Sequence, residues 1–144
     1  MIRIVCVGKI KEKFYRDATC EYLKRMGKYH KIEIVEVSDS NMKKEAGEIL
    51  KRLGNKDFVV TLEIEGNKLS STELSSFIDK TLISNPVITF VIGGSDGLDD
   101  EVKKRANYKL SFSKLTFPHQ LFRVILLEQI YRSFKIINNE TYHK

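Results

Sequence analysis

Two stretches in the second half of the chain decide the fold: VITFVIGGSDGL at 87–98 and YKLSFSKLTFPHQLFRVILLEQIYRSFKII at 108–137. The first predicts a buried strand, Val87 to Ile92, that ends in a glycine pair. The second predicts a short strand, Tyr108 to Leu110, a connecting loop, and a long apolar helix from Gln120 to Ile137. Ligands of open parallel sheets bind beyond the carboxyl ends of the strands, so we expect the functional site at the loops after these two strands.

The remainder of the chain alternates short strands with amphipathic helices. The expected strands are Ile2–Val7, Lys31–Val37 with a bulge at Ile34-Val35, and Phe58–Leu62, which leads into a polar turn at 65–68. The helical signals are the stop residues Gly27 and Gly54, a capping box of Ser70 with Glu73, and an acidic start to a short helix at Asp99, Asp100 and Glu101. This alternation predicts one α/β domain spanning residues 1–144, with a parallel sheet covered by helices on both faces.

The charge balance favours an anionic partner. A net charge of +6 and an isoelectric point near 9.3 make nucleic acid the first candidate. The chain has no run of the ~18–20 apolar residues that a membrane span needs, and it starts directly as a strand, so we expect a cytoplasmic protein without a membrane partner. The loop after the first strand holds only Gly8, which excludes the dinucleotide fingerprint and the P-loop.

The two cysteines are expected to be small buried hydrophobic residues. Cys6 lies in an apolar strand and Cys20 in a helix. Their spacing matches no ligand pattern, so neither a disulfide nor a metal site is predicted.

The last helix carries apolar residues nearly all round, and one sheet face cannot bury them all. Either the helix is threaded deep in the domain or it also packs against another subunit. A symmetric homodimer is the common solution for a small enzyme, and we expect one here.

Several separated motifs together carry a family resemblance. They are VGKIKEKFY at 7–15, VIGGSDGL at 91–98, SFSKLTFPHQLFRV at 111–124, EQIYRSFKI at 128–136 and the terminal YHK at 142–144. In this order they resemble the RlmH family, SPOUT-class enzymes that methylate N3 of a pseudouridine in the 23S RNA of the large ribosomal subunit. The resemblance runs from the first strand to the last residue.

The resemblance implies an α/β knot, in which the segment after the fifth strand is tucked through the loop after the fourth to form a C-terminal trefoil knot. It also implies S-adenosylmethionine bound in a bent shape in that knot, and an active site completed at the interface of a homodimer. By resemblance the cofactor-binding residues are Leu62, Gly93, Phe112, Ser113, Lys114, Leu115, Thr116 and Phe117.

These cofactor residues suit an adenosine, which needs apolar walls and backbone polar groups, with Gly93 allowing close approach. Without the resemblance, Leu62 would be plain core, the glycines a tight turn and the 112–117 segment a connector.

Four residues are candidates for the chemistry: His119, Arg123, Tyr142 and His143. The N3–H of pseudouridine is a weak acid that must lose its proton, so a base or an anion-stabilising cation would help. Alternatives remain for each: His119 as a helix cap, Arg123 as a solvated or interface residue, and the C-terminal residues as a frayed tail. His30 is expected to be inert surface, and no single residue is assigned as the base.

RNA would be held through its phosphates by basic side chains. The candidates are Lys9, Lys11 and Lys13 in one patch and Lys103, Lys104 and Arg105 in another, unless these are ordinary solvated faces. Because the chain has no room for a separate RNA-binding domain, we expect it to recognise an assembled ribosome or large subunit. The rival hypotheses are a non-enzymatic, ribosome-associated RNA-binding protein of the same fold and a flavodoxin-like domain that binds another nucleotide.

Overall fold

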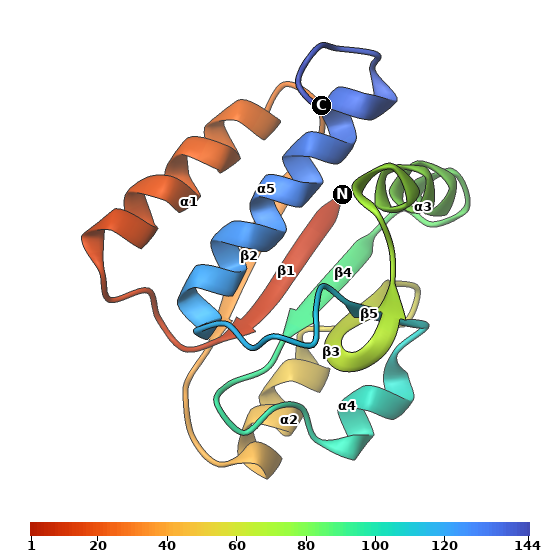
Figure 1. Cartoon of the computed structure of the whole chain (residues 1–144). Coiled ribbons are helices and arrows are strands. Elements are labelled where there is room, and N and C mark those ends of the chain that lie inside the picture. The colour runs from red at the N-terminus through yellow and green to blue at the C-terminus, as the bar shows by residue number, and fades with distance from the viewer.

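The computed structural model describes residues 1–144 and contains one five-stranded sheet, in which every strand pairing is parallel (Figure 1). The strand order is β2-β1-β4-β3-β5. The elements are β1 (Ile2–Val7), α1 (Lys13–Met26), β2 (Ile32–Val37), α2 (Met42–Lys51), β3 (Phe58–Lys68), α3 (Ser71–Ser84), β4 (Ile88–Ile92), α4 (Asp100–Arg105), β5 (Tyr108–Ser111) and α5 (His119–Ile137). The predicted parallel α/β architecture is confirmed.

Helices cover both faces of the sheet, because alternate side chains of each buried strand point to opposite sides. In β1, Ile2, Ile4 and Cys6 pack with α1, α3 and α5 in the larger core, whereas Val5 and Val7 pack with α2 and α4 in the smaller one. Figure 1 shows α1 and α5 side by side across one face.

The two cysteines differ in environment. Cys6 is buried, and burial raises the pKa of its thiol to about 11. Cys20 is exposed on α1, so the prediction that it is buried is wrong. The helical period placed it beside apolar neighbours, but it projects from the solvent side of the helix.

The irregularity expected in β2 lies in β3 instead. The register of β2 against β1 runs without a break from Ile32 to Val37, so the predicted bulge there is wrong. In β3, Leu62 and Asn67 both pair with Leu110, with a register shift between them. The strand therefore continues to Lys68, and residues 65–68, expected as a polar turn, are the bulged end of a strand stabilised by β5.

The helix ends agree with the sequence in two of three places. Gly27 is the C-cap of α1, and Ser70 with Glu73 forms a complete capping box at the start of α3. Gly54 does not end α2, since that helix stops at Lys51. Its backbone N–H instead donates to the carboxylate of Asp57, 2.9 Å away.

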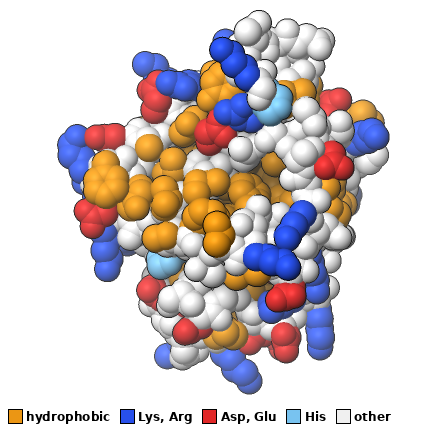
Figure 2. Space-filling view, in the orientation of Figure 1, with side chains coloured by type: hydrophobic (Ala, Val, Ile, Leu, Met, Phe, Trp, Pro, Cys, Tyr) orange, Lys and Arg blue, Asp and Glu red, His pale blue; other side chains and the backbone are white.

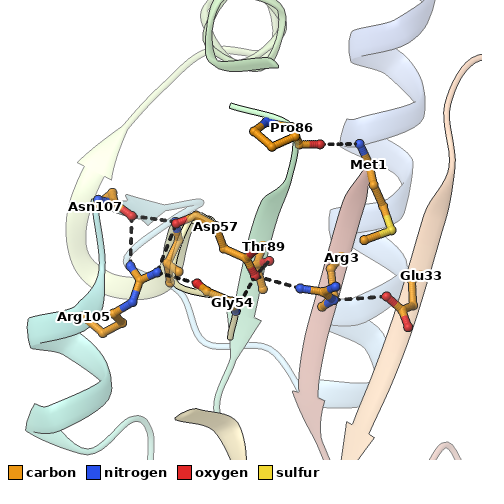
Figure 3. Close-up of polar contacts among 10 residues, drawn as sticks. Met1, Arg3, Glu33, Gly54, Asp57, Pro86, Thr89, Arg105 and Asn107 are labelled. Atoms are coloured by element: carbon orange, nitrogen blue, oxygen red, sulfur yellow. Dashed lines mark hydrogen bonds and ion pairs between the residues drawn. The ribbon is translucent and has the colours of Figure 1, made fainter. Parts of the chain in front are cut away.

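The amino edge of the sheet is closed by a polar network centred on Asp57 (Figure 3). One carboxylate oxygen of Asp57 accepts from Arg3 of β1 at 2.7 Å, from Thr89 of β4 at 2.9 Å and from the Gly54 amide. Arg105, at the end of α4, donates to the carbonyl oxygens of Gly54 and Asp57. These contacts tie strands β1, β3 and β4 together at the edge where they begin.

The chain crosses the opposite, carboxyl edge between β5 and α5. Residues 112–118 leave the edge strand β5 and lead back to the start of α5, where the Gln120 side chain accepts from the Lys11 amide just after β1. This path brings the segment after β5 against the loop after β4, as the resemblance implied. Threading through that loop, which would make the knot, stays a prediction. None of the helices has the length and apolar character needed to cross a membrane.

Candidate active site

A cavity of about 640 Å³ lies at the carboxyl edge of the sheet. Three separate segments build it: the end of β3, the loop after β4 and the segment between β5 and α5. Its apolar walls are Leu62, Ile92, Leu98, Leu110, Phe112, Phe117 and Phe122. All the predicted cofactor residues line it except Lys114, which is exposed outside it.

The loop after β4 leaves no room for a side chain at Gly93. A Cβ there would lie 2.8 Å from the carbonyl carbon and oxygen of Gly97 and 3.0 Å from Leu98. Gly97 has a φ of +84°, a conformation that favours glycine, and it bridges Gly94 across the turn. The glycines therefore keep the loop folded back tightly, with the backbone of Gly93 facing the cavity.

The segment between β5 and α5 forms the opposite wall. The Phe122 ring packs against Phe112 at 5.0 Å and Phe117 at 5.8 Å, measured between ring centroids. The hydroxyl of Ser113 accepts from the Leu115 amide and holds the turn between them. Leu115 itself is 73% exposed at the rim.

His119 stands where the cavity meets the loop after β1. It is the first residue of α5 and lines the cavity, and its Nε2 lies 3.7 Å from the position of a Cβ on Gly8. Pro118 is the N-cap, and no side chain caps this helix. The alternative that His119 is a helix cap is therefore wrong.

Arg123 lies elsewhere. Its side chain is 2% exposed, and its guanidinium donates to Glu36 at 2.7 Å and to the carbonyl of Gly8 at 3.0 Å. It is neither solvated nor part of the cavity wall. Through these two bonds the Arg123 guanidinium ties α5 to the ends of β1 and β2, which gives Arg123 a structural role in this subunit.

The C-terminal residues are docked on the second half of α5, between Glu128 and Arg132. The Tyr142 hydroxyl donates to Glu128 at 3.1 Å, its ring meets Tyr131 edge-on, and the Arg132 guanidinium lies over it. His143 Nδ1 lies 3.1 Å from Arg132. The tail is therefore not frayed, and burial raises the pKa of the Tyr142 phenol.

The structure does not bring the four catalytic candidates together within one chain. His119 starts α5, whereas Tyr142 packs on Glu128 and Arg132, nine and thirteen residues later, which is about 14 to 20 Å along the helix. Only His119 reaches the cavity.

One residue that the sequence reasoning missed is Glu63, which follows Leu62 directly and lines the cavity. Its side chain is 10% exposed, and one of its oxygens accepts from the Thr61 hydroxyl at 2.6 Å. A carboxylate immediately after the predicted apolar wall was the available signal.

Comparison with known proteins decides the family. Residues 1–143 match the family model described as predicted SPOUT methyltransferase. The ribosomal RNA large subunit methyltransferase H of Caldicellulosiruptor saccharolyticus is 47% identical over 154 aligned residues, covering both chains completely. The protein of the same name from Clostridium botulinum is 50% identical over 157, covering 99% of each chain.

The chain belongs to the SPOUT methyltransferase family. Its full-length relatives further place it with the large subunit methyltransferase H group, which is the RlmH family that the motifs resembled. Among solved structures, the SpoU methyltransferase AviRb of Streptomyces viridochromogenes, in complex with AdoMet, superposes with a TM-score of 0.52. At 10% identity, over 96% of this chain and 58% of that one, it supports the fold. The predicted family and fold class are confirmed.

This SPOUT chain presents a broad apolar face. Figure 2 shows hydrophobic side chains gathered in a band across the face that carries α1 and α5. Phe14 is 62% exposed on α1, and Leu121, Val124 and Ile125 of α5 are only half-buried. The prediction that one subunit cannot bury the whole last helix agrees with this exposure.

The two basic patches differ. Lys9 and Lys11 are exposed in the loop after β1, next to the start of α5, and Lys13 pairs with Asp17. In the second patch, Arg105 is bound into the Asp57 network. The first patch is therefore the freer of the two and the nearer to His119.

His30 is not inert surface. Its Nε2 is buried without a hydrogen-bond partner, and its ring stacks on Phe134 at 5.8 Å. Burial lowers its pKa, with a smaller effect from the charge of the N-terminal amine.

Proposed function

We propose that this protein is a homodimeric methyltransferase that uses S-adenosylmethionine to methylate N3 of a pseudouridine in 23S ribosomal RNA. The observation that carries the proposal is the cavity, which is walled by the glycine loop after β4 and the 112–117 segment. An open, preformed cavity of this kind counts against a non-enzymatic protein that has kept only the fold.

The residues present fit the cofactor. The apolar side chains around Leu62 and Leu110 suit the faces of an adenine ring, and the tight turn of Gly93 against Gly97 presents backbone groups at the cavity. Backbone groups of residues 112–117 are available for the polar edges of the base and the ribose. The cofactor supplies an electrophilic methyl group, and the protein has to place the uridine nitrogen in line with it.

His119 is the residue placed to take the N3 proton. It lies at the edge of the cavity and beside the exposed loop after β1, where a base presented by RNA would enter. Its imidazole nitrogen Nε2 would accept the proton as the nitrogen becomes nucleophilic. Arg123 contributes from a distance, by fixing the Gly8 carbonyl and hence the loop that faces His119.

Tyr142 and His143 would enter the active site from the other subunit. If two apolar α5 faces pack about a two-fold axis with the helices antiparallel, the tail of one chain approaches the cavity of its partner. The contacts of Tyr142 lie about 14 to 20 Å along α5 from His119, which favours this arrangement over one in which a single chain supplies every group.

The RNA would be bound through its phosphates by Lys9 and Lys11, which are exposed in the loop after β1 beside the start of α5. Together with the net charge of +6, this suits a large structured substrate, the assembled ribosome or large subunit, and so a cytoplasmic site of action.

The direct test is transfer of a labelled methyl group from S-adenosylmethionine to ribosomes that lack the modification. Incorporation at N3 of one pseudouridine in 23S RNA is expected, with strong loss in His119→Ala. A folded protein that binds the cofactor but labels no ribosomal particle would contradict the proposed substrate.

The dimer has its own test. Ile125→Glu places a charge in the apolar face and should yield a folded monomer in sedimentation analysis. That monomer should lose methyl transfer, and mixing it with a His119→Ala chain should restore none. A monomeric wild type with full activity would contradict the shared site.

A further inference from the structure

Two acidic residues line the cavity, Glu63 and Glu65, and Glu63 is the less exposed of them. Its Oε2 accepts from Thr61, whose side chain is fully buried in β3 and so fixes the carboxylate. Its Oε1 faces the Lys103 ammonium at 3.9 Å, beyond hydrogen-bonding distance. The carboxylate therefore faces the cavity with one oxygen that has no hydrogen-bond donor from the protein, and a ligand can supply that donor.

We infer that Glu63 binds the ribose hydroxyls of the nucleoside that occupies this cavity. The inference rests on the proposed function, since it assumes that the adenosine of S-adenosylmethionine is that nucleoside. An ionised carboxylate only accepts hydrogen bonds, and the two hydroxyls of a ribose are donors held side by side. Acidic residues near the ends of parallel strands bind ribose in the same way in dinucleotide-binding folds.

The position of Glu63 favours the ribose over other parts of the cofactor. It follows Leu62, an apolar wall suited to the base, and both residues line the cavity, with their side chains on opposite faces of β3. The ribose is bonded directly to the base, whereas the α-amino group lies at the end of a flexible chain.

The positive charge of Lys103 next to Glu63 also favours binding of the ribose. Lys103 also lines the cavity, 3.9 Å from the carboxylate. An ammonium group of the ligand at this place would meet the like charge of Lys103, while neutral hydroxyls would not. The Lys103 side chain is 39% exposed, so it remains hydrated and leaves Oε1 to the ligand.

The test uses ligands that differ in a single group, titrated into the full-length protein. The probes are S-adenosylhomocysteine, 5′-methylthioadenosine, which lacks the amino-acid part, and the 2′-deoxy and 3′-deoxy forms of methylthioadenosine. In the wild type, removal of a hydroxyl that Glu63 accepts should weaken binding about 10-fold, as expected for a hydrogen bond to a charged group.

The isosteric variant Glu63→Gln should weaken S-adenosylhomocysteine and methylthioadenosine equally, by about 10-fold, and should no longer distinguish them from the deoxy ligands. Glu101→Gln is the matched control, because Glu101 is exposed on α4 and does not line the cavity. It should keep the wild-type preference for ribose. A circular dichroism melt of each variant separates loss of binding from loss of fold.

The outcomes separate the two proposals. Failure of the wild type to bind any of these ligands overturns the proposed function and this inference with it. Binding without preference for ribose, or an effect of Glu63→Gln restricted to S-adenosylhomocysteine, overturns the inference alone, since the carboxylate would then serve the fold or the amino-acid part.

Discussion

The two edges of the sheet differ in how far their polar groups are hydrogen-bonded within the protein. At the amino edge, Asp57 has three donors on one oxygen, and each donor comes from a different part of the chain. At the carboxyl edge, Glu63 has one donor, Gly93 carries no side chain, and a cavity of about 640 Å³ stays open. The amino edge (Figure 3) has satisfied the polar groups of the Asp57 network internally.

This difference separates stability from function within one sheet. Groups that satisfy one another hold the strands in register, and a ligand would add nothing to them. Groups that remain open at the other edge are useful only when something binds. The same reasoning predicts that substitutions at the two edges have different consequences.

The largest loss of stability is expected from Asp57→Ala. It leaves Arg3, Thr89 and the Gly54 amide without their shared acceptor, and loss of one partner from a largely buried ion pair costs about 3 kcal/mol. Urea denaturation should show the loss, while the affinity of the folded fraction for S-adenosylmethionine stays unchanged. Asp79→Ala, on the exposed side of α3, is the control and should change little. Equal stability of the two variants would contradict the structural role of the amino-edge network.

A smaller loss of stability, about 2 kcal/mol, is expected from Arg123→Met. Arg123 lies at the carboxyl edge, but its hydrogen bonds are satisfied within the protein like those of the Asp57 network, because it is buried and bonded to Glu36 and Gly8. The variant should unfold at lower urea concentration and weaken methyl transfer more than cofactor binding, since the loop facing His119 loses its support. A variant with full stability but no activity would instead assign Arg123 to direct contact with RNA.

The smallest effect on stability is expected from His30, whose buried Nε2 has no hydrogen-bond partner and lies outside the Asp57 network. Burial lowers its pKa in the folded state, so the unfolded chain binds a proton first as the pH falls through its ordinary value of 6.5. The wild type should therefore lose stability in mild acid, and His30→Phe should flatten that dependence while keeping the stack on Phe134. Thermal melts between neutral and mildly acidic pH test this; an unchanged slope would contradict the burial of His30.

The sequence predicted the parts of the fold that depend on local pattern. The buried strand at Ile2–Val7, the long helix through Ile137 and the capping box at Ser70 all follow from periodicity or short-range hydrogen bonds. The family motifs further located the cavity walls at Gly93 and the 112–117 segment.

Features that depend on contacts between residues far apart in the chain could not be predicted from the sequence. The extension of β3 past Leu62 exists because Leu110 pairs with it from β5, and the turn-like composition of residues 65–68 concealed this. Burial of Arg123 depends on Glu36 and Gly8, which lie 87 and 115 residues away in the chain. The role of Glu63 likewise could not be predicted from the sequence, because a single acidic residue in a strand can serve many functions. Only the structure shows that it lines the cavity.

The central claim, that the carboxyl edge holds the cofactor, is tested most directly by calorimetric titration of S-adenosylmethionine into the wild type and Gly93→Leu. A Cβ at Gly93 meets Gly97 backbone atoms at 2.8 Å, so the variant should fold but bind no cofactor. Gly47→Leu is the control, since a Cβ at Gly47 on α2 meets nothing within 4 Å. We predict one site per subunit in the wild type and in Gly47→Leu, and none in Gly93→Leu. Undiminished binding by folded Gly93→Leu, or no binding by the folded wild type, would contradict the account.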